Sequence, residues 1–213
     1  MLKNIFWALL YKRPEEPTMP YSPQHAVQTR ARIVESARRL FNRHGFEQVT
    51  IDQIMASADL TRGAFYHHFR SKDELYASAV ASFVTCNPFA VQTASAAQSL
   101  DDPRSLARML IELYLSDEVL ENIDMHCPLY ALPSDVARAG LEPQQAYTDL
   151  IRGMSHIYGA ALEGLDDADR RAETMVALCV GGMVLARTTN DAQLRSSLRA
   201  SARYQALVLL DAA

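Results

Sequence analysis

The chain has few of the residues that define disulfide-rich, fibrous or membrane-embedded proteins. Its 213 residues include only three cysteines, and this odd, widely spaced set excludes a disulfide scaffold or a zinc site built from cysteine pairs. Eight glycines and nine prolines without a fixed repeat exclude a collagen-like or low-complexity chain. The longest apolar run near the start, residues 5–10, is far shorter than the roughly 20 residues of a membrane helix. Charges and prolines follow this run instead of a signal cleavage site, so we expect a cytoplasmic protein with no membrane partner.

An apolar content of 49% with 22% charged residues is enough to fill the core of one or two domains. From residue 29 onward, apolar residues recur every three or four positions, and no alternating pattern typical of strands competes with them. The sequence therefore predicts an all-α fold. Residues 1–27 carry four prolines and no sustained period, so we expect an irregular extension there, within which Met19 is an alternative translation start.

Charge is distributed unevenly along the chain. Through Lys72 there are 11 basic and 6 acidic residues, and beyond it 10 basic and 19 acidic residues, within a net charge of −4. A nucleic-acid surface confined to the first third of the chain would produce this division, and so would a chance clustering of solvated charges. Charge alone leaves both interpretations open.

Three helices are predicted within residues 29–69. An apolar face with helical spacing indicates the first helix, and Gly45 can adopt the left-handed conformation that ends it. Thr50 and Gln53 have the spacing of a capping box that starts the second helix, and Thr61 can cap the third, over about 62–69. Only two residues separate the second helix from Thr61, so the third must leave at a steep angle. A fourth helix is expected from Ser71 to about residue 87.

The stretch from Thr50 to Leu75 reads TIDQIMASADLTRGAFYHHFRSKDEL and resembles the DNA-binding segment of TetR-type (TetR/AcrR) transcriptional regulators. The resemblance covers about residues 29–84. It rests on the glycine after the first helix, the threonine that opens the second, and the run Gly63, Phe65, Tyr66, His68, Phe69 and Lys72. It implies an N-terminal three-helix helix-turn-helix domain over 28–87 and a larger helical ligand-binding and dimerisation domain over 88–213.

The resemblance also implies which residues contact DNA. Polar side chains at helix starts would hold the sugar-phosphate backbone, and Gly63 would let the third helix approach DNA closely. Base reading would fall to residues of the third helix such as Arg62, whose guanidinium bonds either a guanine or a phosphate. The predicted DNA-binding residues are Thr50, Thr61, Arg62, Gly63, Ala64, Tyr66, His67 and Lys72.

The adjacent His67 and His68 do not predict a metal site. Neighbouring residues on a helix point about 100° apart, and no carboxylate or cysteine stands beside them at a ligating spacing. We expect no metal and no cofactor, with His67 near DNA and His68 partly buried.

One helix-turn-helix reads too few bases for useful specificity, so we expect a homodimer on a palindromic double-stranded DNA operator. In the family that the sequence resembles, the last two helices, here 168–188 and 192–210, pair with their mates as a four-helix bundle. An ordinary intrachain core is the alternative. The predicted interface residues are Leu178, Gly181, Gly182, Leu185, Leu198, Tyr204, Leu207 and Val208.

Helices between residues 106 and 162 are predicted to enclose a pocket for a small-molecule effector. Their methionines and tyrosines offer adaptable apolar surfaces with a few polar groups, although such residues more often fill a core. The predicted ligand-binding residues are Met109, Tyr114, Met125, His126, Cys127, Tyr130, Tyr147, Met154 and Tyr158.

Cys127 has two interpretations. Pro128 suits the first position of a helix, which would leave the thiol near a helix N-terminus beside His126, and both features could lower its pKa. The segment HCPLYAL is similar to the corresponding region of TetR-type repressors that sense electrophiles or oxidants through a cysteine. The alternative is an inert buried thiol.

These patterns predict a ligand-responsive DNA-binding regulator, a repressor that releases its operator when a small molecule or a thiol-reactive compound acts on the C-terminal domain. One alternative is a constitutive DNA-binding protein without an effector. Another is an all-α enzyme with Cys127 as nucleophile and His126 as base. The enzyme is disfavoured because adjacent residues seldom face one another on a helix, so we expect no enzymatic activity.

Overall fold

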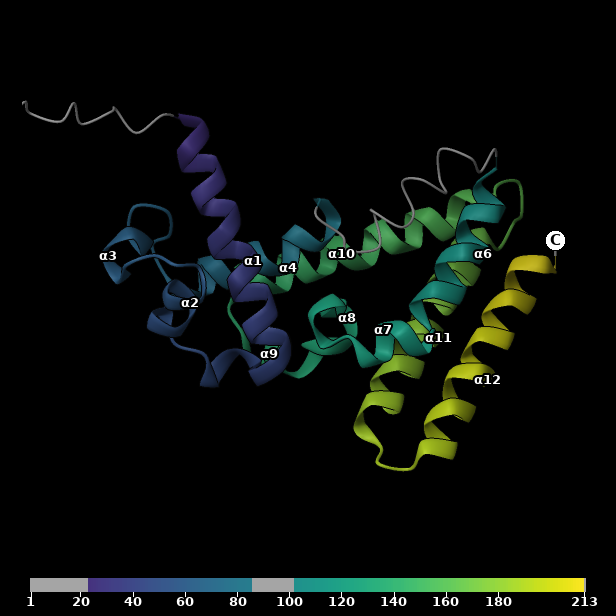
Figure 1. Cartoon of the computed structure of the whole chain (residues 1–213). Coiled ribbons are helices and arrows are strands. Elements are labelled where there is room, and N and C mark those ends of the chain that lie inside the picture. The colour runs from purple at the N-terminus through teal and green to yellow at the C-terminus, as the bar shows by residue number, and fades with distance from the viewer. Residues whose placement is uncertain (1–22, 86–101, 213) are drawn as a thin grey trace, which may run out of the picture.

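The computed structural model describes residues 23–85 and 102–212, and within these ranges every regular element is a helix (Figure 1). The predicted all-α fold is confirmed. In chain order the elements are α1 (Pro23–Gln48), α2 (Ile51–Ser57), α3 (Arg62–Phe65), α4 (Lys72–Thr85), α6 (Pro103–Tyr114), α7 (Asp117–Glu121), the 3₁₀ helix η1 (Ile123–Met125), α8 (Pro128–Ala131), α9 (Pro133–Arg138), α10 (Leu141–Ala160), α11 (Ala168–Thr188) and α12 (Ala192–Asp211). None of these described helices is both long and apolar enough to cross a membrane.

Helix α1 begins at Pro23, earlier than the sequence pattern indicated. Residues 23–27 are therefore helical, which differs from the irregular extension expected through residue 27. Proline is well tolerated in a first helical turn, where its missing N–H has no partner to lose. The turn was missed because residues 24–28 are mostly exposed and present no apolar face. Residues 1–22 and the predicted domain boundary after residue 87 lie outside the described residues.

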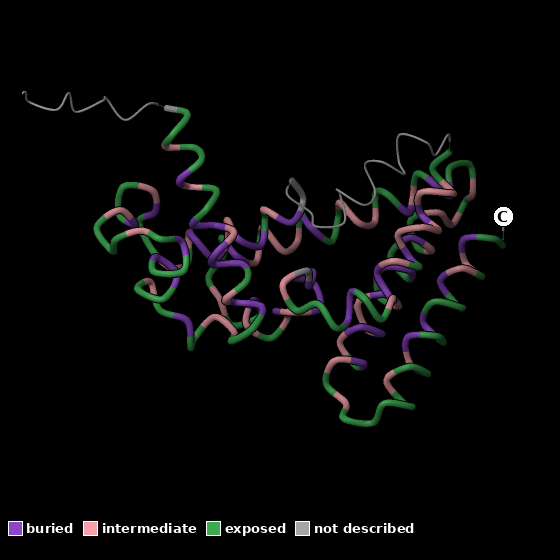
Figure 2. Tube along the Cα trace, viewed as in Figure 1, coloured by how far each residue is buried: buried purple, intermediate pink, exposed green. Residues whose placement is uncertain are grey.

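Two hydrophobic cores organise the described chain. The first unites α1 to α4 and includes Ile33, Phe41, Phe65 and Tyr76, all fully buried. The second is built from α6, α7, α8, α10, α11 and α12. Figure 1 shows α1, α2 and α3 at one end of the molecule and α12 at the other, with the long α10 running between them. In Figure 2 the buried positions follow the inner sides of these helices.

Helices α11 and α12 lie side by side, and their bounds match the helices predicted for this part of the sequence. Their close approach depends on Gly182. A Cβ atom added there would lie only 2.7 Å from the Cβ of Ala202, closer than two carbon atoms can pack. The glycine therefore permits intrachain packing, whereas Gly181, next to it, faces open space.

Candidate functional site

The predicted capping box at the start of α2 is confirmed. The backbone N–H of Gln53 donates to the Thr50 hydroxyl over 3.2 Å, and the Thr50 backbone N–H donates to Gln53 Oε1 over 2.8 Å. The turn after α2 contains Asp59 with a φ of 53°, a left-handed conformation that aspartate tolerates better than most residues. This turn redirects the chain into α3.

Helix α1 holds this turn in place. The Arg32 guanidinium donates to the carbonyl oxygen of Ala58 over 2.5 Å, and the Ser36 hydroxyl donates to the carbonyl oxygen of Ile54 over 3.1 Å. The Ala58 carbonyl oxygen lies at the C-terminal end of α2, where helix carbonyls lack intrahelical partners, and the Ile54 carbonyl oxygen also accepts the backbone N–H of Ala58. Helix α2 is thereby fixed to α1, and α3 is presented from a rigid base.

Helix α3 is shorter than the sequence indicated, ending at Phe65 instead of near Phe69. Beyond it the backbone N–H groups of His67 and His68 donate to carbonyl oxygens only three residues back, so the chain tightens into turns. Phe65 and Phe69 are both buried, with their rings stacked 5.7 Å apart. Tyr66 and His67 lie between these two buried phenylalanines in the chain and are exposed to solvent.

Most predicted DNA-binding residues are accessible to solvent. Ala64 and Lys72 are half-buried, and the exposed members are Thr50, Thr61, Arg62, Gly63, Tyr66 and His67. Tyr66 is 58% exposed, its ring lies 5.2 Å from that of Phe65, and its hydroxyl interacts with Arg62. Arg62 pairs with Asp52 of α2 over 2.7 Å, and both side chains remain more than half exposed.

Lys72 is bound within its own chain. Its Nζ donates to the carbonyl oxygen of Phe46 over 2.5 Å and lies 4.1 Å from the centre of the Phe46 ring. Burial lowers the pKa of the Lys72 ammonium group. Because an ammonium group carries three donors, this arrangement leaves two N–H groups for another acceptor.

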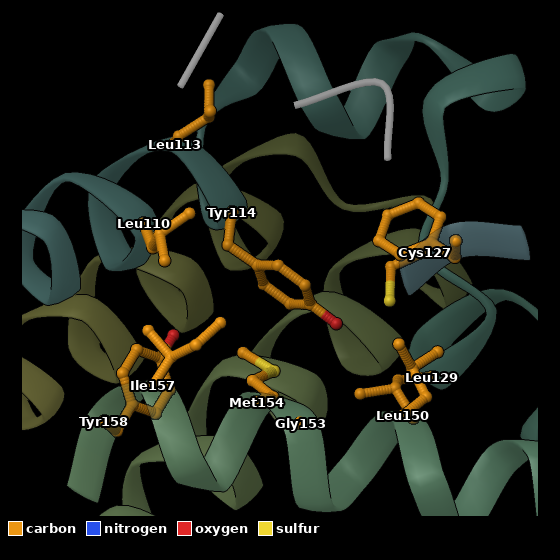
Figure 3. A pocket seen from close by; sticks show the side chains of 11 residues that line it. Leu110, Leu113, Tyr114, Cys127, Leu129, Leu150, Gly153, Met154, Ile157 and Tyr158 are labelled. Atoms are coloured by element: carbon orange, nitrogen blue, oxygen red, sulfur yellow. The ribbon is translucent and has the colours of Figure 1, made fainter. Parts of the chain in front are cut away.

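A cavity of about 270 Å³ lies between α4, α6, α8 and α10 (Figure 3). It adjoins both domains predicted from the sequence, because Phe83 of α4 forms part of its wall. The lining residues are Phe83, Leu110, Leu113, Tyr114, Cys127, Leu129, Leu150, Gly153, Met154, Ile157 and Tyr158.

Four of the nine predicted ligand-binding residues line this cavity: Tyr114, Cys127, Met154 and Tyr158. Four others do not, namely Met109, His126, Tyr130 and Tyr147, and the side chain of Met125 lies outside the described part of the chain. Tyr130 and His126 are core residues instead, with ring centres 5.0 Å apart. The Tyr147 hydroxyl donates to the carbonyl oxygen of Leu129 over 2.6 Å.

The missed lining residues are mainly aliphatic. Leu150, Gly153 and Ile157 share the helical spacing of α10 with the predicted Met154 and Tyr158, a signal that was present in the sequence. That spacing identifies a buried face but does not separate residues at a cavity from residues in close contact.

Of the two interpretations of Cys127, the one with a lowered pKa is wrong, and the buried thiol is the one that the structure supports. The thiol is 2% exposed, and this burial raises its pKa to about 12 because an apolar environment disfavours the thiolate. His126 is also buried, which lowers its pKa and keeps the imidazole neutral, so it supplies no positive charge to the neighbouring sulfur.

Sequence reasoning also missed two residues that connect α1 to the segment before Cys127. Arg38 and Asn42 belong to the polar side of α1, yet both are buried. Asn42 Nδ2 donates to the carbonyl oxygens of His126 over 2.9 Å and Ile123 over 3.3 Å, and Arg38 Nη1 donates to that of Asp124 over 2.5 Å. These contacts join the two cores.

A shallow groove runs between α11 and α12. Its walls include all the predicted interface residues except Leu207 and Val208. Leu185 is 52% exposed and Tyr204 68% exposed, so a large apolar surface is in contact with solvent. Val208 is also exposed, and Leu207 is half-buried.

The geometry of α1 to α3 defines a helix-turn-helix protein with a larger helical domain behind it. The family model described as "Bacterial regulatory proteins, tetR family" matches residues 33–79, which span most of α1 and all of α2 and α3. The chain is 25% identical over 170 residues to the transcriptional regulator TtgR of Pseudomonas putida, an alignment that covers 74% of this chain and 80% of TtgR.

Other similarities agree with this assignment. The probable regulator ArpR of Pseudomonas putida is 30% identical over 91 residues, an alignment that covers 43% of this chain and 43% of ArpR. The crystal structure of a TetR-family regulator from Agrobacterium tumefaciens has the same fold, with a TM-score of 0.68, 20% identity and coverage of 84% of this chain and 98% of the other. The chain belongs to the TetR family and is a DNA-binding transcriptional regulator.

Proposed function

We propose that this protein is a homodimeric repressor that leaves a palindromic operator when a small molecule occupies the cavity between α4, α6, α8 and α10. The observation that carries this proposal is the position of the cavity. Its wall includes Phe83 of α4, the helix that packs against both α1 and α10. A molecule in the cavity would contact an element of the DNA-binding domain, taken here as residues 28–87.

The surface around α3 would bind the major groove. Arg62, Tyr66 and His67 are exposed there and can reach base edges and phosphates, while Gly63 lets the backbone come close. Lys72 would offer its remaining N–H groups to a phosphate while holding Phe46. Thr50, Thr61 and Ala64 would complete the contact surface.

The groove between α11 and α12 would be covered by the same groove of a second copy. An exposed apolar surface of this kind is costly to leave in water and suits a self-complementary interface. The two DNA-binding domains of the dimer would then reach successive major grooves about 34 Å apart.

Two physical connections would transmit a structural change at the cavity to the DNA-binding domain. One is α4. The other is the segment before Cys127, whose carbonyl oxygens accept hydrogen bonds from Arg38 and Asn42 of α1. Release requires that the effector prefer a dimer whose domains are wrongly spaced for DNA, with a coupling free energy on the order of 1–3 kcal/mol. Because the Cys127 thiol is buried, we propose non-covalent binding rather than thiol modification.

We propose that the protein acts in the cytoplasm. Footprinting of the purified protein on DNA that flanks its own gene tests operator binding. Arg62→Ala should weaken operator preference, because it removes an exposed guanidinium from α3. Arg152→Ala is the matched control, since it removes an exposed, ion-paired arginine from α10 and not from α3. Equal footprints for both variants would contradict the assignment of α3 as the reading element.

Sedimentation of Leu185→Glu tests the proposed dimer. A charge placed in the groove should shift the protein to a monomer and weaken operator binding, because two half-sites would no longer be held together. A variant that remains dimeric would show that the interface lies elsewhere. Operator affinity that stays constant when the cavity is filled would favour a constitutive DNA-binding protein.

A further inference from the structure

The wall of the cavity is apolar and uncharged among the described residues. Its polar side-chain atoms belong to Tyr114, Tyr158 and Cys127, and its remaining side chains come from aliphatic, phenylalanine and methionine residues. The segment 86–101, which the structure does not describe, contains one charged residue in its sequence, Asp101. A charged ligand would lose its hydration in this wall without gaining a partner of opposite charge.

Two of the three polar atoms are poor partners for a ligand. The Tyr158 hydroxyl already contacts Cys179 Sγ at 3.7 Å. The Cys127 sulfur is a protonated thiol, which is a weak donor and a weak acceptor. The remaining polar atom, the Tyr114 hydroxyl, must therefore provide the orientation within the cavity.

Tyr114 is 6% exposed, and the polar group that its hydroxyl meets is the Cys127 thiol, a weak hydrogen-bond partner. Figure 3 shows the ring projecting among the lining side chains, with the oxygen directed toward the side of Cys127 and Leu129. Burial raises the pKa of this phenol well above its usual value, so the hydroxyl keeps its proton and is available as a donor. A buried hydroxyl donor with only a weak sulfur partner is unfavourable, and an oxygen acceptor on a ligand would satisfy it better.

The size of the cavity limits the ligand further. An apolar protein cavity of about 150 Å³ accommodates benzene. A cavity of about 270 Å³ therefore has room for roughly two fused rings. Phe83, Tyr114 and Tyr158 offer aromatic contacts and Met154 a polarisable sulfur, which favour flat ring systems.

We propose that the cavity binds a neutral, mainly apolar molecule of one or two fused rings that presents a single hydrogen-bond acceptor to the Tyr114 hydroxyl. This proposal specifies the ligand class of the effector site proposed above, and it rests on that proposed function only where it concerns release of the operator. Binding itself does not depend on DNA.

Titration calorimetry of the full-length protein with three probes tests the ligand class. 1-Tetralone is a neutral bicyclic ketone, tetralin lacks its oxygen, and 1-naphthoate has a similar shape with a negative charge. We expect 1-tetralone to bind more tightly than tetralin, and 1-naphthoate to bind at least tenfold more weakly than 1-tetralone. Tighter binding of 1-naphthoate would overturn the proposal.

Tyr114→Phe tests the hydrogen bond. The variant keeps the ring and removes a hydroxyl whose partner is the weakly bonding Cys127 thiol, so the free protein should melt close to the wild-type temperature. Its affinity for 1-tetralone should fall roughly fivefold, and its affinity for tetralin should not change. Equal affinities for 1-tetralone in the variant and the wild type would contradict the role of Tyr114.

Gly153→Leu tests the location. Gly153 lines the cavity and no atom lies within 4 Å of a Cβ added there, so a larger side chain fills empty space. Gly159→Leu is the matched control, because it lies on the same helix with an equally open Cβ position and is not part of the wall. We expect Gly153→Leu to weaken 1-tetralone binding at least tenfold and Gly159→Leu to leave it unchanged. Unchanged binding by Gly153→Leu would refute this site.

The same titrations repeated with operator DNA separate the two proposals. Binding of 1-tetralone without a change in operator affinity supports the ligand class and contradicts the proposed release mechanism. Release of the operator by charged molecules, with no binding of 1-tetralone, supports a regulated repressor and overturns the ligand class.

Discussion

Replacement of Gly63 by alanine should change folding stability and DNA affinity in opposite directions. Gly63 is the second residue of α3 and is exposed. Within the described chain, the glycines with positive φ are Gly45 and Gly164, so the backbone at Gly63 is one that any residue can adopt. A Cβ atom there would have the Thr61 hydroxyl 3.9 Å away as its sole neighbour within 4 Å. The fold of this chain therefore gives no steric reason for a glycine.

The magnitude follows from these contacts. Alanine in a helix is favoured over glycine by about 0.5–1 kcal/mol, so the free energy of unfolding of Gly63→Ala should rise by up to that amount. If α3 lies against DNA, the added methyl group enters a tight interface, where overpacking typically costs about 1–3 kcal/mol. Operator affinity should therefore fall about tenfold or more, and two half-sites would increase the loss.

Two measurements check this prediction. Urea unfolding gives the stability, and fluorescence anisotropy with a labelled operator gives the affinity at one fixed salt concentration. Gly159→Ala is the control, because it makes the same substitution at an open position of α10. The reasoning fails if Gly63→Ala binds the operator as tightly as the wild type, since the glycine would then have no role at a DNA surface.

Three further substitutions and reactions test other parts of the structure. Asp52→Asn frees Arg62 from its exposed ion pair and removes a negative charge from the proposed DNA surface. Its affinity for non-specific duplex DNA should therefore rise several-fold in anisotropy titrations, and a lower affinity would contradict this. Gly182→Ala should lower the free energy of unfolding by about 1–3 kcal/mol, because the added Cβ atom would lie 2.7 Å from Ala202 of α12. Gly181→Ala should not lower it. Equal urea midpoints for the two variants would show that the helices move apart to make room. The Cys127 thiol, with a pKa of about 12, should be alkylated by iodoacetamide roughly a thousandfold more slowly in the folded protein than in urea, as measured by mass spectrometry. Its raised pKa also predicts a loss of stability as the pH rises from about 9 towards 12, because the unfolded chain releases the proton first, and rapid labelling of the folded protein at pH 8 would contradict both expectations.

The helix-turn-helix was predictable because its signals are local. The Thr50 and Gln53 side chains satisfy backbone groups three residues apart, so their spacing alone determines where α2 begins. Helices α11 and α12 were predictable for a similar reason, since their apolar period continues for about 20 residues and Asp191 caps the start of α12. Such interactions depend on sequence neighbours and not on distant parts of the chain.

Only the tertiary structure decided the properties that depend on distant packing. The same apolar period describes a residue at a cavity and a residue in a filled core. Leu150 and Ile157 could be assigned to the cavity wall only once the arrangement of the four surrounding helices was known. The sequence left two interpretations of Cys127 open because it shows the neighbouring proline but not the apolar side chains that bury the sulfur. Arg38, on the polar side of α1, became a buried link only because η1 folds against it. Local hydrogen bonding determined the helices, and burial, which sums contacts over the whole chain, determined what lies between them.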